Sequence, residues 1–168
     1  MGCESSMTRA FAVAGVFLFM AGIAACSKKP QQQMAIGQEA GGPVVPGTAR
    51  DFSVNAGDKV LFTVDSASLT ARAQATLRQQ AVWLNKYPQY GVTLEGHADE
   101  RGTREYNIAL GARRAAAVRT YLAGLGVNAG RLRTISYGKE RPVAVCNDIS
   151  CWSQNRRAVT ALNSRPGS

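Results

Sequence analysis

The pattern of hydrophobic and polar residues changes several times along this chain of 168 residues. After residue 59, short runs that suit strands alternate with two longer segments of helical period. We expect strands at 60–64, 91–96, 132–138 and 157–162, and helices at about 70–87 and 103–124. This β-α-β-α-β-β order predicts the α/β class, a sandwich in which both helices pack on one small mixed sheet.

The first predicted helix has one apolar stripe. Apolar residues recur along it at spacings of three and four, which places them on one buried face: Leu69, Ala73, Leu77, Ala81 and Leu84. Trp83 lies off this stripe, and Pro88 follows the end of the helix. We therefore expect a helix that buries this one face.

The second predicted helix carries an arginine inside its apolar stripe. With successive residues about 100° apart, Arg114 falls among apolar and aromatic side chains, with Asn107 on the same face. The members of this stripe are Tyr106, Leu110, Ala117, Val118 and Tyr121. Burying a guanidinium costs several kcal/mol unless it is paired, so Arg114 requires a carboxylate from the protein or from a ligand.

The loop before this helix supplies a candidate partner. It runs from His97 to Thr103 and contains Asp99, at the junction between a strand and a helix, where α/β folds place ligands. Asp99 could accept from a ligand ammonium while Arg114 binds a ligand carboxylate, which would suit the zwitterionic end of an amino acid. Alternatively, Asp99 and Arg114 pair with each other, and the pattern alone favours neither arrangement.

The start of the chain has the pattern of a bacterial lipoprotein signal. Residues 11–26 form an apolar run behind a basic residue, and the small residues Ala24 and Ala25 stand immediately before Cys26. The run is shorter than the roughly 20 residues that a membrane-spanning helix needs. We expect residues 1–25 to be removed and the Cys26 thiol to be lipidated, the alternative being an ordinary cleaved signal. Met1 and Met7 are both possible translation starts.

The segment that follows Cys26 predicts a flexible linker. Residues 27–49 are rich in Gln, Gly and Pro and show no apolar period. We expect a lipidated linker at 26–58, a folded domain at 59–163 and a short tail at 164–168. Ser27 stands where an Asp would resemble an inner-membrane retention signal, so we expect the outer membrane.

The net charge of the chain limits the classes of partner that it can bind. The chain has 20 Lys and Arg against 11 Asp and Glu, a net charge of +9, and removal of residues 1–25 leaves that value unchanged. In a cytosolic protein this balance would favour nucleic acid, but an exported chain meets cell-wall carboxylates and anionic lipids instead. We therefore expect no nucleic acid partner.

Cysteine and histidine content bears on cross-links and metals. Cys146 and Cys151 lie close together, and in an oxidising compartment they predict a disulfide worth about 2 kcal/mol of stability. His97 is the one histidine, so a zinc site would have to recruit it together with a carboxylate. We expect neither a metal nor another cofactor.

Three segments resemble the OmpA-like peptidoglycan-binding domain family. They are LEGHADERGTREYNIALGARRAAAVRTYL (94–122), ISYGKERP (135–142) and SQNRRAV (153–159). The resemblance covers 59–163, and the signal and linker are similar to those of lipid-anchored members. It implies non-covalent binding of peptidoglycan through the diaminopimelate of the stem peptide, with Asp99 and Arg114 as the binding residues. It also implies that Asn107 orders the loop and that Leu110 packs beneath it.

One part of the motif departs from the family. The first strand of the family often has the pattern Phe-Asp-x-Asp, whereas this chain has Phe62, Thr63 and Asp65 at the defining positions. Thr63 replaces one acid, so we assign Phe62 and Asp65 supporting roles only. Arg113 is either a second ligand contact or a solvated charge, with the second favoured. The loop between the two cysteines is an elaboration to which we assign a structural role.

The resemblance also implies partners and a location. It places the chain in the Tol-Pal system, with TolB and the inner-membrane Tol proteins as partners, on the outer membrane facing the periplasm. Its role there is to couple that membrane to the wall during constriction at cell division. We expect a binding module and no enzyme.

Two alternatives remain. A muramidase could use Asp99 with Glu95 or Glu100 as its two acids, although no residue is marked as an acid of raised pKa. A lipoprotein that only bridges proteins would leave Arg114 without a ligand carboxylate.

Overall fold

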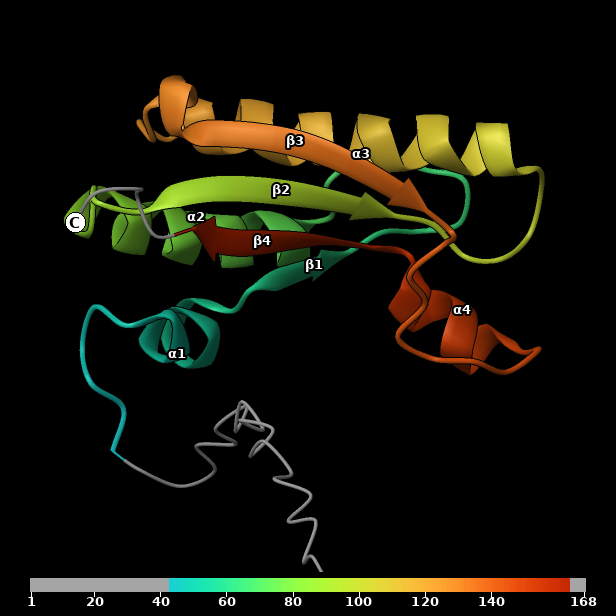
Figure 1. The fold of residues 1–168 in the computed structure, drawn as a ribbon, viewed down its shortest axis with the longest axis horizontal. Helices are drawn as coiled ribbons and strands as arrows, with labels where there is room; N and C mark the ends of the chain where they lie inside the picture. The colour runs from blue at the N-terminus through green and yellow to red at the C-terminus, as the bar shows by residue number, and fades with distance from the viewer. Residues whose placement is uncertain (1–42, 164–168) are drawn as a thin grey trace, which may run out of the picture. The chain divides into compact units, whose positions relative to one another are not determined.

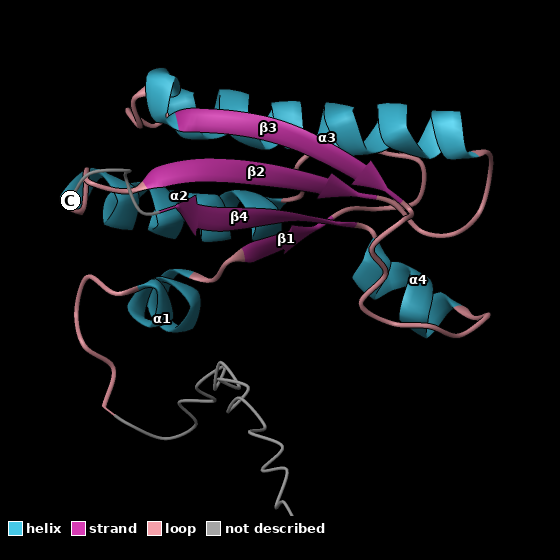
Figure 2. Cartoon of the chain, in the orientation of Figure 1, coloured by secondary structure: helices cyan, strands magenta, loops and turns pink. Residues whose placement is uncertain are grey.

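The computed structural model describes residues 43–163. The predictions for the signal peptide, Cys26, the first part of the linker and the tail lie outside the described residues. Figure 2 shows helices and strands over the described range, and Figure 1 labels them along the chain. Their bounds are α1 (Ala49–Asp51), η1 (Phe52–Ala56), β1 (Lys59–Leu61), α2 (Ala71–Lys86), β2 (Gly91–His97), α3 (Arg104–Gly124), η2 (Ala129–Arg131), β3 (Leu132–Gly138), α4 (Ile149–Asn155) and β4 (Arg157–Asn163).

The strands form one mixed sheet in the order β1-β4-β2-β3. β2 and β3 are parallel, whereas β4 runs antiparallel to both of its neighbours. The long helices α2 and α3 lie on the same face of this sheet (Figure 1). The predicted α/β class with helices on a small mixed sheet is therefore confirmed. None of the helices within 43–163 has the length and apolar character needed to cross a membrane.

The predicted elements begin and end within two residues of the observed ones except at the end of β1, and residues 43–163 contain four short helices that were not predicted. β1 covers only Lys59–Leu61 instead of 60–64, because the chain leaves the sheet after Phe62, whose N–H donates to the carbonyl of Arg156. The unpredicted helices are α1, η1, η2 and α4. The two long helices begin where Thr70 and Thr103 cap them, each hydroxyl accepting from a backbone N–H three residues later.

The segment 49–56, which we expected within the linker, belongs to the folded part. Phe52 is 1 % exposed and packs its ring 5.0 Å from that of Trp83. The Asp51 carboxylate accepts from Trp83 Nε1 at 2.7 Å, and the Tyr90 hydroxyl donates to the carbonyl of Gly47 at 2.7 Å. The fold therefore begins before Lys59, and Trp83, which lies off the predicted stripe, is buried against this segment.

Helix α3 packs very closely on the sheet. A Cβ built at Gly111 would lie 2.8 Å from the carbonyl oxygen of Gly96, and one built at Gly96 would lie 1.8 Å from that of Gly111. Only glycines permit this approach. The predicted stripe of α3 was slightly rotated: Tyr106 is 43 % exposed, while Gly111 and Ala115 are buried instead. The consequence is that Arg114, at the centre of the buried face, has no exposed surface at all.

Candidate functional site

The loop that carries Asp99 leaves the sheet at an irregular point. The pairing of β2 with β3 shifts register between Gly96 and His97, and the N–H of Ala98 then donates to the carbonyl of Gly138 at 2.8 Å. A register shift redirects the strand that contains it. It leads the chain to Asp99 and then to the start of α3, so that the loop and the helix form two sides of one site.

Arg114 is held by backbone oxygens. Its Nε donates to the carbonyl of Ser66 at 2.9 Å, Nη1 to that of His97 at 2.7 Å and Nη2 to that of Thr63 at 3.1 Å. Its guanidinium carbon lies 5.2 Å from the centre of the Phe62 ring. Burial lowers the pKa of Arg114 to about 10, so the side chain stays charged at neutral pH. A full positive charge is thus kept inside the domain by carbonyl groups.

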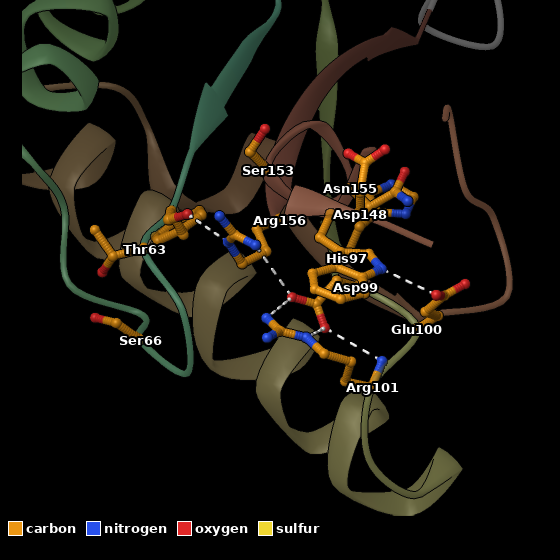
Figure 3. A network of polar contacts seen from close by, with 12 residues as sticks. Thr63, Ser66, His97, Asp99, Glu100, Arg101, Asp148, Ser153, Asn155 and Arg156 are labelled. Carbon is orange, nitrogen blue, oxygen red and sulfur yellow. Dashed lines mark hydrogen bonds and ion pairs between the residues drawn. The ribbon is translucent and has the colours of Figure 1, made fainter. Parts of the chain in front are cut away.

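Asp99 is 7 % exposed and pairs with two other arginines (Figure 3). Its carboxylate accepts from Nη2 of Arg101 at 2.7 Å and from Nη1 of Arg156 at 3.2 Å. Burial alone would raise the pKa of Asp99, but hydrogen bonds from Arg101 and Arg156 outweigh it and hold the pKa below its usual value. The direct pair between Asp99 and Arg114, which the sequence left open, is not the arrangement observed.

Asp99 and Arg114 nevertheless share one open pocket of about 260 Å³. Its lining residues are Val64, Asp65, Asp99, Arg101, Gly102, Tyr106, Asn107, Leu110 and Arg114. The Tyr106 hydroxyl donates to the Asp65 carboxylate, which raises the pKa of Tyr106. Asn107 Nδ2 donates to the carbonyl of Arg101 at 2.8 Å and so holds the loop. A larger groove of about 870 Å³ along β1 and the start of α2 contains none of the residues predicted to bind the ligand, although Glu95, a candidate acid of the muramidase alternative, lines it.

Two predicted positions lie outside this lining. Phe62 is buried behind Arg114, and Arg113 is exposed, with its guanidinium carbon 5.9 Å from the centre of the Tyr106 ring. Thr63 contributes its carbonyl, which any residue would supply, so the missing acid at this position does not remove the support of Arg114.

Comparisons with known proteins agree on one family. The OmpA family model matches residues 61–156. A peptidoglycan-associated lipoprotein from Mesorhizobium japonicum is 56% identical over 97% of this chain and 98% of its own length, and one from Rhizobium meliloti is 63% identical over 86% and 82%. The crystal structure of the peptidoglycan-associated lipoprotein from Burkholderia pseudomallei is 45% identical, with a TM-score of 0.62 over 63% of this chain and 90% of that one. The chain belongs to the OmpA family, among the peptidoglycan-associated lipoproteins.

Arg156 is a partner of Asp99 in this OmpA-family chain that the sequence did not reveal. It is 6 % exposed, and besides its contact with Asp99 it donates from Nε to the carbonyl of Phe62 at 3.2 Å. It therefore links the end of β1 to the loop after β2. The one signal available was a pair of adjacent arginines, Arg156 and Arg157, at the start of a predicted strand and within the motif SQNRRAV.

The predicted disulfide between Cys146 and Cys151 is present, with a Cα–Cα distance of 5.7 Å. It closes the loop before α4, and Trp152 of that helix borders the site of this OmpA-family domain. Trp152 Nε1 donates to the Glu100 carboxylate at 2.9 Å, and the guanidinium carbon of Arg101 lies 4.4 Å from the centre of the Trp152 ring. The loop between the cysteines thus supports a helix in contact with the loop that carries Asp99.

Proposed function

We propose that this lipoprotein binds peptidoglycan non-covalently through the diaminopimelate residue of the stem peptide. The observation that carries the proposal is the charged, fully buried Arg114 in the same pocket as Asp99. A guanidinium has five N–H donors, and three of them are taken by carbonyl groups. One N–H remains on each of Nη1 and Nη2, and two N–H groups are the number that a bidentate contact with a ligand carboxylate uses. Asp99 would then accept from the ligand ammonium.

The pocket has to open slightly for this contact. Arg114 lines it but has no exposed surface, so a ligand carboxylate reaches the guanidinium only after a covering side chain moves. The hydrogen bond between Tyr106 and Asp65 and the ion pair between Arg101 and Asp99 are the contacts at the pocket between movable side chains. Both involve exposed partners, so the motion requires no change in the core.

In the cell this binding would tether the outer membrane to the wall. We infer a lipid anchor at Cys26, a domain that faces the periplasm, and TolB and the other Tol proteins as partners during constriction. The names of the closely similar relatives and the lipoprotein signal support this placement.

Binding suits the site better than hydrolysis. A muramidase requires one acid of raised pKa, whereas hydrogen bonds from two arginines hold the pKa of Asp99 low. Asp99 therefore does not suit the role of the protonated acid in the muramidase alternative.

The test is co-sedimentation of the full chain, purified in detergent, with sacculi that contain diaminopimelate. We expect the wild type to pellet and the folded variants Asp99→Asn and Arg114→Met to remain in the supernatant. Arg113→Gln is the matched control. It removes the same charge from the neighbouring residue, whose side chain is exposed. Muropeptides released into the supernatant would show an enzyme, and failure of the wild type to pellet would contradict wall binding.

A further inference from the structure

In the free protein the carboxylate of Asp99 is fully occupied. Arg101 donates to it three times, from its backbone N–H and Nε to Oδ1 at 3.2 Å each and from Nη2 to Oδ2 at 2.7 Å. Arg156 adds a fourth bond, from Nη1 to Oδ2 at 3.2 Å. A carboxylate has about four acceptor positions in total. A ligand ammonium therefore finds no free position on Asp99 until one of these donors leaves.

The two arginines differ in how firmly they are fixed. The side chain of Arg156 is 8% exposed and also donates to the carbonyl of Phe62, so it is part of the packed interior. The side chain of Arg101 is 42% exposed, and both of its own hydrogen bonds go to Asp99. Exposed ion pairs are weak compared with buried ones. Arg101 is thus the donor that can be displaced.

The structure also provides a place for the displaced guanidinium. Its carbon already lies 4.4 Å from the centre of the Trp152 ring, within the range of a cation–π contact. Trp152 is itself held by the Glu100 carboxylate at 2.9 Å, and this exposed acid is next to Arg101 in the sequence. The Arg101 guanidinium can therefore leave Asp99 while it keeps its contact with the Trp152 ring and stays close to the negative charge of Glu100.

We propose that Arg101 determines specificity by occupying the position on Asp99 that the ligand ammonium takes on binding. This inference rests on the proposed function and names the contact that the ligand must replace. When the Arg101 side chain leaves, its backbone N–H and Arg156 stay on the carboxylate, and two acceptor positions become free. A ligand with a free amine at the right place fills them. A ligand without that charge has nothing with which to replace Arg101.

The test compares two soluble probes against the full chain in detergent, by isothermal titration calorimetry. One probe is the stem tripeptide that ends in diaminopimelate, and the other is the same peptide with its side-chain amine acetylated. We expect Arg101→Gln to bind the free-amine peptide about two- to five-fold more tightly than the wild type does, the range that one exposed ion pair accounts for. The affinity for the acetylated peptide should not change.

Arg104→Gln serves as the matched control. It removes the same charge three residues along the chain, and Arg104 pairs with Glu140 instead of Asp99. It should leave both affinities at the wild-type value. A second readout is the fluorescence of Trp152, which should change when the free-amine peptide binds to the wild type and stay constant with the acetylated one.

Three results would overturn the proposal. Weaker or unchanged binding of the free-amine peptide by Arg101→Gln would mean that Arg101 contacts the ligand or does not compete. An equal gain in affinity for both peptides would mean that Arg101→Gln acts through the net charge of the domain and not through Asp99. No binding of either peptide by the wild type would instead overturn the proposed function, and this proposal with it.

Discussion

The two arginines that bind Asp99 should contribute very different amounts to the stability of the domain. Arg156→Gln removes a buried charge that bonds both Asp99 and the carbonyl of Phe62, each at 3.2 Å. Breaking a buried pair costs about 3–5 kcal/mol, and Asp99 keeps Arg101, so we expect a loss of about 3 kcal/mol. Arg101→Gln removes an exposed side chain and should cost less than about 1 kcal/mol.

Urea unfolding followed by far-ultraviolet circular dichroism measures this difference. For a domain of this size the slope is about 1–3 kcal/mol per M, so Arg156→Gln should lower the midpoint by about 1 M or more at constant slope. Arg101→Gln should shift the midpoint only slightly. Equal losses in the two variants, or a larger loss for Arg101→Gln, would refute the assignment of Arg156 as the fixed partner and Arg101 as the movable one.

Three further predictions concern other parts of the domain. Gly111→Ala should cost about 1–3 kcal/mol in thermal unfolding because its Cβ would meet the sheet, whereas Gly124→Ala, whose Cβ meets nothing within 4 Å, should gain about 0.5 kcal/mol. Burial and the charges of two nearby arginines lower the pKa of His97 to about 4 from its ordinary 6.5, so the unfolded chain takes up the proton first. Stability should therefore fall as the pH drops from about 6.5 to 4, by at most about 3 kcal/mol, and urea midpoints of His97→Gln should lack this dependence. Reduction of the Cys146–Cys151 disulfide should cost about 2 kcal/mol, measured by unfolding with and without reductant.

The regular elements could be predicted because their periods are strong. The stripe from Ala73 to Leu84 and the short β-branched runs have one interpretation each, and the predicted sheet follows from their order. The segment 49–56 escaped prediction because it is short and its turn of π-helix has no apolar period of its own. Its burial depends on Trp83, which lies more than 25 residues further along the chain.

The site was predictable only in part, for a related reason. Arg114 could be located because a charge inside an apolar stripe conflicts with burial and demands partners. Those partners are backbone carbonyls, and no residue identity encodes a carbonyl, so the sequence suggested a carboxylate instead. Arg156 reaches Asp99 across 57 positions, and such a pair depends on how the strands are ordered.

The docked segment 43–56 has a mechanical consequence in the role proposed above. It includes α1 and lies at one end of the sheet, while the loop after β2 lies at the other end (Figure 1). Tension from a membrane anchor would enter the domain through this segment, whose attachments include the pairs Asp51–Trp83 and Gly47–Tyr90. Detachment of residues 43–57 would release about 50 Å of chain before the hydrogen bonds of Asp58 and β1 with β4 carried the load. The linker would then lengthen under tension while the peptidoglycan-binding site stayed folded.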